Sequence, residues 1–185
     1  MLIDHSREKL INAAIYFARH TKYCGLTKLM KLLAFMDFVH FRQTGRSVTG
    51  LDYYAWRRGP VPKTFWSELK DQKLPDIVKN LCVLGDDEIK FCEVKPKQRF
   101  DGKHFSKREI KIMEQLAYIY NETIAKDIVE ISHLRNQPWD KTVKNKGYDA
   151  IIDYELAIDN QSDSLPKEEI ARRLKIDHAI KKAVA

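Results

Sequence analysis

The stretch that begins at Leu26 and runs to about Arg42 constrains this chain most, because it is apolar on almost every face. At the 3.6-residue period of an α-helix, its leucine, methionine, alanine and phenylalanine side chains occupy nearly the whole circumference. A helix of this kind is buried inside a protein. Gly45 follows it and is a typical helix stop. The sequence therefore predicts a central helix at about 26–42, around which the other elements pack.

Three ionisable side chains interrupt the densest apolar part of this helix, 29–41, namely Lys31, Asp37 and His40. The dense apolar run that contains them, 29–41, is shorter than the ~18 residues that a membrane-spanning helix needs. The first five residues have neither a basic region nor a small-residue cleavage site. We therefore expect no contact with a membrane and no secretion signal.

Further helices are predicted by apolar residues at helical spacing and by capping signals. The clearest signal is the capping box of Ser106 and Glu109, which Phe105 and Ile110 surround as a hydrophobic staple. Pro62 can open a short helix, because proline fits the first helical turn. The predicted helices besides the central one are about 6–20, a short segment after Pro62, 106–120, 123–134 and 167–182.

One β-hairpin is predicted, from about Leu81–Leu84 to Ile89–Val94, with a turn at Gly85-Asp86-Asp87. The segment 148–158 fits either a strand or a helical turn. We expect a mainly α fold, in which a compact helical domain carries the small β-hairpin as an α+β minority element. Residues 1–185 then form a single domain, with a core at about 6–158 and a C-terminal helix at about 165–183.

The composition agrees with one globular domain. The chain has 185 residues, of which 44% are hydrophobic and 32% charged, and such a length can fold without disulfides or metals. Its three cysteines, Cys24, Cys82 and Cys92, are odd in number and contain no Cys-x-x-Cys pair. This pattern favours a reducing compartment, so we expect a cytoplasmic protein without a disulfide.

Common enzyme signatures are absent from the sequence. It contains no G-x-G-x-x-G, G-x-x-x-x-G-K-[ST], H-E-x-x-H or G-x-S-x-G motif. Two carboxylate–histidine pairs, Asp37/His40 and Glu130/His133, do have the i,i+3 spacing that di-iron helical bundles use. A second pair of inward carboxylates is not evident, so we expect no catalytic residue, no metal and no cofactor. A di-metal enzyme is kept as an alternative.

Most of the net charge of +7 lies in the segment 95–108, which has six basic residues and one acidic residue. Pro96 and Gly102 predict an exposed loop there. Such bases can contact phosphates while Phe100 and His104 stack on bases, so a nucleic-acid-binding regulator that recognises operator DNA is an alternative function. The residues of this second predicted contact region are Lys97, Arg99 and Lys103.

The segment 53–66 contains five large aromatic rings in fourteen residues. Most of these rings are expected in the core. Trp56 differs because two arginines follow it, and tryptophan and arginine dominate protein–protein hot spots. A Gly-Pro turn after the arginines would present them rigidly. The predicted partner-binding face is Trp56, Arg57, Arg58 and Pro60.

Three groups of residues resemble the Panacea domain family, which is also described as SocA-like. They are 26–35 (LTKLMKLLAF) with Thr44-Gly45-Arg46, then 55–62 (AWRRGPVP), and finally 132–139 (SHLRNQPW). The likeness covers about 10–158. Relatives more often carry a tyrosine before Gly-Pro, where this chain has Arg58.

This resemblance alone implies an antitoxin of a bacterial or prophage toxin–antitoxin system. Such an antitoxin neutralises a protein toxin encoded nearby by direct complex formation. A protease adaptor that delivers the toxin for degradation is an alternative that would use the same scaffold. We expect His133 and Trp139 to be structural, the histidine by hydrogen bonding at a helix end and the tryptophan by closing the core.

Overall fold

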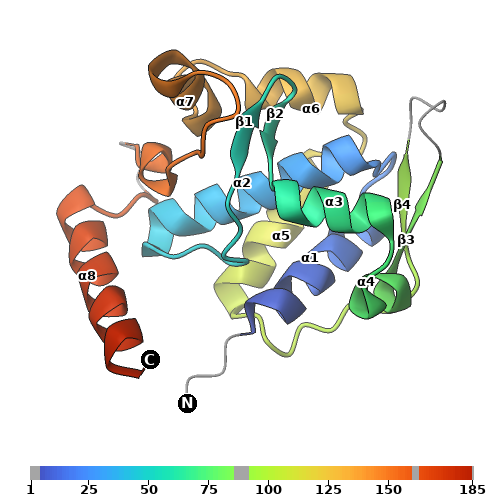
Figure 1. Ribbon diagram of the computed structural model, residues 1–185, viewed down its shortest axis with the longest axis horizontal. Coiled ribbons are helices and arrows are strands. Elements are labelled where there is room, and N and C mark those ends of the chain that lie inside the picture. The colour runs from blue at the N-terminus through green and yellow to red at the C-terminus, as the bar shows by residue number, and fades with distance from the viewer. Residues whose placement is uncertain (1–4, 86–91, 160–162, 185) are drawn as a thin grey trace.

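The computed structural model describes residues 5–85, 92–159 and 163–184, and these ranges are mainly helical (Figure 1). The helices are α1 (Ser6–His20), α2 (Leu26–Thr44), α3 (Lys63–Asp71), α4 (Pro75–Asn80), α5 (Lys107–Ile119), α6 (Ala125–Ser132), α7 (Pro138–Lys146), the 3-10 helix η1 (Tyr154–Ala157) and α8 (Lys167–Val184). Two antiparallel hairpins pair β1 (Tyr54–Trp56) with β2 (Gly59–Val61), and β3 (Leu81–Leu84) with β4 (Glu93–Pro96). The predicted mainly α fold class is confirmed.

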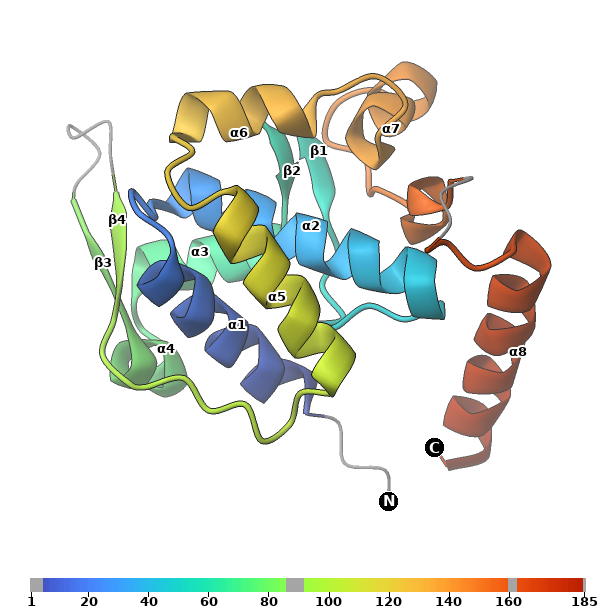
Figure 2. The same cartoon turned by 180° about the vertical axis from the view of Figure 1, so that it is seen from behind.

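Helix α2 is the centre of the fold, as its composition predicts (Figures 1 and 2). It contacts α1, α5, α6, η1 and β2, and the side chains of Leu29, Leu32 and Leu33 are completely buried. The helix ends at Thr44, slightly beyond the predicted end. Gly45 then adopts the left-handed conformation with φ 78°, which costs glycine no strain. The other elements are therefore positioned by their contacts with α2.

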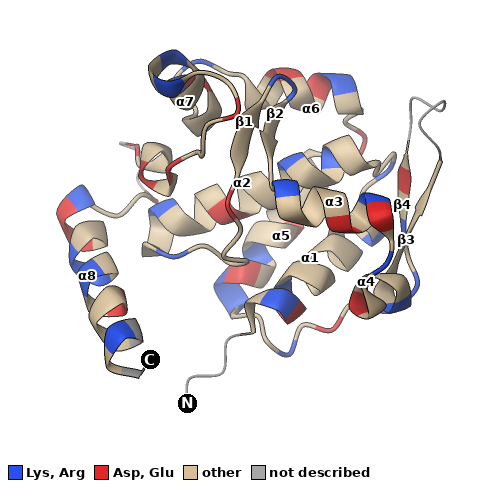
Figure 3. Cartoon of the chain, viewed as in Figure 1, with Lys and Arg blue, Asp and Glu red and all other residues tan. Residues whose placement is uncertain are grey.

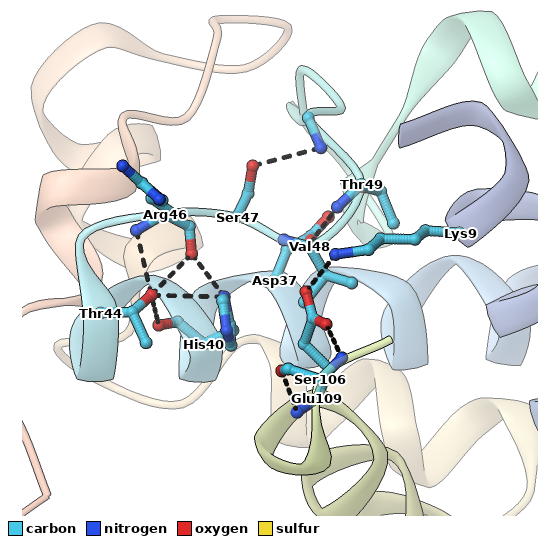
Figure 4. Close-up of polar contacts among 11 residues, drawn as sticks. Lys9, Asp37, His40, Thr44, Arg46, Ser47, Val48, Thr49, Ser106 and Glu109 are labelled. Carbon is cyan, nitrogen blue, oxygen red and sulfur yellow. Dashed lines mark hydrogen bonds and ion pairs between the residues drawn. The ribbon is translucent and has the colours of Figure 1, made fainter. Parts of the chain in front are cut away.

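Asp37 of α2 anchors the loop that leads to β1 (Figure 4). Its carboxylate accepts hydrogen bonds from the backbone N–H groups of Val48 (2.7 Å) and Thr49 (2.9 Å). The hydroxyl groups of Thr49 and Tyr53 also donate to it, the latter at 2.7 Å. Because the carboxylate is completely buried, these four donors replace the water that it loses on folding.

Lys28 and His40 fix two further loops to α2 and are also buried. The Nζ of Lys28 donates to the carbonyl groups of Lys22 (2.6 Å) and Asn121 (3.0 Å). The Nδ1 of His40 lies 2.7 Å from the carbonyl oxygen of Arg46. Burial lowers the pKa of both side chains, because their charged forms lose water. Ionisable residues within the apolar helix are thus connections to the surrounding loops.

The capping box predicted at the start of α5 is confirmed (Figure 4). The hydroxyl of Ser106 accepts from the N–H of Glu109, and the Glu109 carboxylate accepts from the N–H of Ser106 at 2.6 Å. That carboxylate also lies 2.6 Å from the Nζ of Lys9. The cap of α5 therefore serves a second purpose, which is to bind α1.

The β3–β4 hairpin corresponds to the predicted hairpin, and its register pairs Val83 with Val94. Asp86 and Asp87 of the predicted turn, and residues 89–91 of the predicted second strand, lie outside the described residues. Cys24, Cys82 and Cys92 are not joined by a disulfide bond in the structure.

The segment 148–158, which the sequence left open between a strand and a helical turn, is followed by helix α8. Residues 148–158 include both of the predicted alternatives, since Ile151 forms an isolated β-bridge with Tyr54 and η1 follows. Helix α8 packs against the end of α2 through Ile170, which contacts Phe41 and Ile158. The rest of α8 stands beside the body of the domain (Figures 1 and 2). Within the described ranges, no helix combines the length and apolarity that crossing a membrane requires.

Candidate functional site

The predicted partner-binding residues lie on the β1–β2 hairpin, which the sequence did not predict. Trp56 pairs with Gly59, so Arg57 and Arg58 form the turn between the two strands. Gly59 and Pro60 were expected to form a turn and lie instead in β2. A proline is tolerated there because β2 is an edge strand, paired with β1 alone among the described strands. The exposed tip of the hairpin therefore consists of the two arginines.

Hydrogen bonds from three parts of the chain hold this hairpin. The indole Nε1 of Trp139 donates to the carbonyl of Trp56 at 2.8 Å, and the Nζ of Lys31 donates to the carbonyl of Pro60 at 2.9 Å. The segment 149–152 adds backbone hydrogen bonds to β1 and its approach. Because its support is rigid, the tip can bind a partner with little loss of conformational entropy.

Gly59 allows Lys31 and α6 to approach the hairpin closely. Its φ is +95°, and a Cβ at this position would lie 2.3 Å from the Oγ of Ser132 and 2.7 Å from the Cε of Lys31. A residue with a side chain would therefore meet both backbone strain and a clash. The close packing beneath the tip depends on this glycine.

We expect Gly59→Ala to lower the free energy of unfolding by about 2–4 kcal/mol, since strained backbone and overpacking cost about 1–3 kcal/mol each. Urea unfolding would measure the loss. Gly147→Ala is the matched control, because Gly147 also has a positive φ of +83° but an added Cβ would have no neighbour within 4 Å. Equal losses in the two variants would show that the approach of Lys31 and Ser132 does not require Gly59.

A hollow of about 270 Å³ lies beside the hairpin at the N-terminal end of α2, and we call it the tryptophan pocket. The rings of Trp56 and Trp66 meet edge to face in its wall, with their centroids 5.4 Å apart. The charged side chains that line it are Lys31, Arg58 and Lys70, and among the described residues no acidic side chain joins them. The pocket therefore combines an apolar wall with positive charge.

A second hollow, the large groove, has a volume of about 690 Å³ and lies between α2, α5, α7 and η1. Its lining mixes apolar side chains, such as Phe38 from α2 and Leu116 from α5, with polar and charged ones such as Arg42. Pro60 of β2 forms part of its wall. The hairpin thus stands between two hollows of different character.

The predicted residues of the tip have different environments. Arg57 is exposed, and its guanidinium carbon lies 5.5 Å from the centroid of the Tyr148 ring. Arg58 is exposed at the tryptophan pocket, whereas Trp56 is partly buried. Pro60 is buried, so its contribution to the site is the carbonyl that binds Lys31. The exposed surface of the tip therefore consists of the two arginines, with Trp56 partly exposed beside them.

The second predicted contact region lies at the opposite end of the molecule. Lys97, Arg99 and Lys103 are all exposed, and their segment passes along the end of the domain that is remote from the β1–β2 tip (Figures 1 and 2). Lys97 donates to the carbonyl of Val78 at 2.9 Å, and Lys103 lies 3.5 Å from Asp101. The structure does not bring this region together with the arginine tip.

His133 and Trp139 lie behind the hairpin. Trp139 is 8% exposed and packs with Phe38 and Tyr53 in the core. The backbone N–H of His133 closes α6, but its ring stacks on Trp139 with centroids 3.8 Å apart. The Nε2 of His133 is buried and finds no hydrogen-bond partner among the described residues. The ring is therefore positioned by stacking, where the sequence suggested hydrogen bonding.

Comparison with known protein families identifies the family of this chain. The family model described as Antitoxin SocA-like, Panacea domain, matches residues 29–140, which is more than half of the chain. The chain belongs to this family. No curated protein and no solved structure matches it. The Panacea match includes most of α2, both hairpins, α5 and α6. Membership suggests an antitoxin-type role with a protein partner, and a binding role in preference to a catalytic one.

The two carboxylate–histidine pairs of this Panacea domain do not have the surroundings of metal ligands. Asp37 is bonded to hydroxyl and N–H donors, His40 to a carbonyl, and Glu130 is exposed. No cluster of three potential metal ligands within the described ranges includes either pair. These observations favour the structural interpretation of both pairs.

One surface cluster does have the spacing of metal ligands, with ligand atoms of His5, Glu8 and His104 all within 4.8 Å. The two imidazole rings stack with centroids 3.8 Å apart and an interplanar angle of 20°. Imidazole lone pairs lie in the ring plane, so in stacked rings they point side by side and do not converge on one ion. We assign this cluster no function.

The sequence did not identify two residues of the candidate site at the β1–β2 hairpin, Lys31 and Tyr148. Lys31 could have been identified, because a charge inside a helix that is apolar all round must be paired, functional or costly. Tyr148, which contacts Arg57, carries no such signal, since only the tertiary fold brings it to the tip.

Proposed function

We propose that this Panacea domain neutralises a protein toxin by forming a complex with it, and that the Arg57–Arg58 tip is the centre of the contact face. The observation that carries the proposal is the double-arginine turn itself. Two exposed arginines occupy the end of a hairpin whose backbone is fixed by Trp139 and Lys31. The toxin would be encoded nearby, and the complex would form in the cytoplasm.

General properties of protein interfaces support this proposal. A stable complex buries about 800 Å² on each partner, and its affinity depends on a few anchors such as arginine and tryptophan. The tip supplies both residue types on a rigid support. A binding protein of this kind inactivates a toxin by covering its active site, and this role needs no catalytic group of its own.

Helix α8 carries a second group of basic residues, and their pairing with acidic residues makes this helix unsuited to operator DNA. Arg172 and Arg173 both bind Glu169 at 2.8 Å, and Asp177 binds Arg46. Basic and acidic residues alternate along this helix (Figure 3). Bases that are already paired with acids release fewer counterions from DNA. This helix is therefore a poor phosphate-binding surface.

The test is co-expression of the chain with the product of a neighbouring gene that is toxic when expressed alone. We expect the wild-type chain to restore growth and the double variant Arg57→Glu, Arg58→Glu to lose about 100-fold in affinity for the toxin, a loss typical of two hot-spot residues. The melting temperature should be unchanged, because both side chains are exposed.

The matched control is Lys73→Glu with Lys111→Glu, which makes the same charge change at two exposed positions outside both predicted contact regions. This control should neutralise the toxin like the wild type. Equal neutralisation by the tip variant and the wild type would refute the proposed contact face. If the toxin disappears only in cells that contain a particular protease, the adaptor mechanism holds instead.

A further inference from the structure

The tryptophan pocket lies where helix α2 begins, and this helix end has no cap. The N-cap residue is Gly25, which has no side chain to accept a hydrogen bond, and the first turn contains no acidic residue. The N–H of Leu26 donates to the carbonyl of Cys92. Among the described contacts, none provides an acceptor for the N–H of Thr27 or Lys28. Such a helix end carries a partial positive charge and attracts anions.

A buried ammonium group lines the same pocket and is independent of the helix end. Lys31 is 1% exposed, and its Nζ makes one described hydrogen bond, to the carbonyl of Pro60. No described ion pair joins this ammonium to a carboxylate. Burial lowers the pKa of Lys31 to about 7, because the charged form is desolvated. A negative group in the pocket would compensate this charge.

The shape and remaining lining of the pocket restrict what could enter it. Its volume of about 270 Å³ is below the range of about 300–1,000 Å³ that is typical for drug-sized ligands, so it fits one side chain. The exposed Arg58 lies at the pocket and belongs to the arginine tip. The wall formed by Trp56 and Trp66 would pack against the methylene groups of the side chain that enters the pocket.

We infer that the tryptophan pocket receives an acidic side chain of the partner protein, whose carboxylate binds Lys31, Arg58 and the backbone N–H of Thr27 in the first turn of α2. This inference rests on the proposed function. It assigns to the contact face an anchor point of defined chemistry beside the arginine tip. Charge complementarity selects the occupant, since the pocket offers donors and cations on its described surface and no acid.

The first experiment titrates the isolated chain with sodium acetate at pH 6.5 and constant ionic strength, and follows the amide signals by NMR. We expect saturable shifts for the backbone N–H groups of Thr27 and Arg58, because both residues line the pocket. Lys31→Met should weaken acetate binding at least 5-fold. The control is Lys111→Met, which removes an exposed lysine of α5 that does not line the pocket and should leave acetate binding unchanged.

The second experiment measures affinity for the toxin that the co-expression test identifies. We expect Lys31→Met and the surface variant Arg58→Gln each to weaken the complex about 10-fold. One acidic residue of the toxin, when changed to its amide, should cause the same loss and no further loss in combination with Lys31→Met. Arg58→Gln keeps the test decisive if Lys31→Met does not fold.

Four results would overturn the inference. In the titration, these are the absence of saturable acetate shifts at the pocket, or binding of inorganic phosphate that is at least 10-fold tighter than binding of acetate. In the affinity measurement, they are toxin binding that neither pocket variant weakens, or losses from Lys31→Met that add to the loss from every acidic residue of the toxin. If the wild-type chain does not neutralise the neighbouring toxin at all, the proposed function fails and no toxin supplies the carboxylate. The acetate titration would then still decide the chemistry of the pocket separately.

Discussion

Replacing Asp37 by alanine is expected to lower the free energy of unfolding by about 4–5 kcal/mol. The substitution leaves two backbone N–H groups and two hydroxyl groups, those of Thr49 and Tyr53, without their acceptor. Each buried donor that loses its partner costs about 1–3 kcal/mol, and part of this cost is recovered when water enters. For a domain of this size the loss corresponds to a melting temperature lower by about 10–15 °C.

Chemical denaturation of three variants would test this expectation. Asp37→Asn keeps one carbonyl oxygen and should lose less stability than Asp37→Ala. Asp52→Ala removes an exposed carboxylate from the same loop region and should change the free energy of unfolding by less than 0.5 kcal/mol, as surface substitutions do. A loss below about 1 kcal/mol for Asp37→Ala would show that this carboxylate does not hold the loop between α2 and β1.

The helices that could be predicted from the sequence are those with local signals. Residues 6–20 and 26–42 have apolar side chains at helical spacing, and the structure contains α1 and α2 there. The capping box of Ser106 and Glu109 identified the first residue of α5 correctly. Apolar periodicity and capping are properties of a short stretch of chain, so they can be recognised without knowledge of the tertiary fold.

Strand β2 and helix α7 were not predicted, because proline is compatible with more than one local structure. Pro60 suggested a turn, yet it lies in β2, where its missing N–H is not needed. No helix was predicted between 134 and 167, yet Pro138 is the first residue of α7. Which local structure forms depends on neighbours such as Trp139 and Lys31, which bind the hairpin from distant parts of the chain.

The candidate site was predictable only in part, for the same reason. Residue type alone indicated that Arg57 and Arg58 are suited to binding, and both are exposed at the tip. Residue type could not indicate that Pro60 is buried, or that the basic segment near Lys97 lies at the other end of the domain. Burial and separation in space are consequences of the tertiary fold.

Replacing Lys31 by methionine is expected to remove a large part of the pH dependence of stability between pH 7 and pH 10. Burial lowers the pKa of Lys31 to about 7 in the folded chain, from 10.5 for an ordinary lysine. Between these values the unfolded chain binds a proton that the folded chain does not, so stability rises as the pH rises. The rise is about 1.4 kcal/mol for each pH unit, on the order of 4 kcal/mol over this interval.

Urea unfolding of the wild type and of Lys31→Met at several pH values would measure this difference. Other groups that titrate in the interval are common to both proteins, so the difference between the two curves isolates Lys31. The exposed Lys111→Met is the control, and its curve should parallel that of the wild type. Parallel curves for Lys31→Met and the wild type would mean that this ammonium is not desolvated when the chain is folded.

The expected slope also bears on why the chain has a lysine at this position. Near neutral pH the buried ammonium of Lys31 lowers the stability of the isolated domain, and methionine would fill the same space without a charge. The hydrogen bond to Pro60 has an ordinary length of 2.9 Å, and a single bond from a charged group to a carbonyl offsets only about 1.5–3 kcal/mol. A carboxylate docked in the tryptophan pocket would offset the remainder. The wild type should therefore lose part of its pH dependence when the partner is bound, whereas Lys31→Met should show no such change.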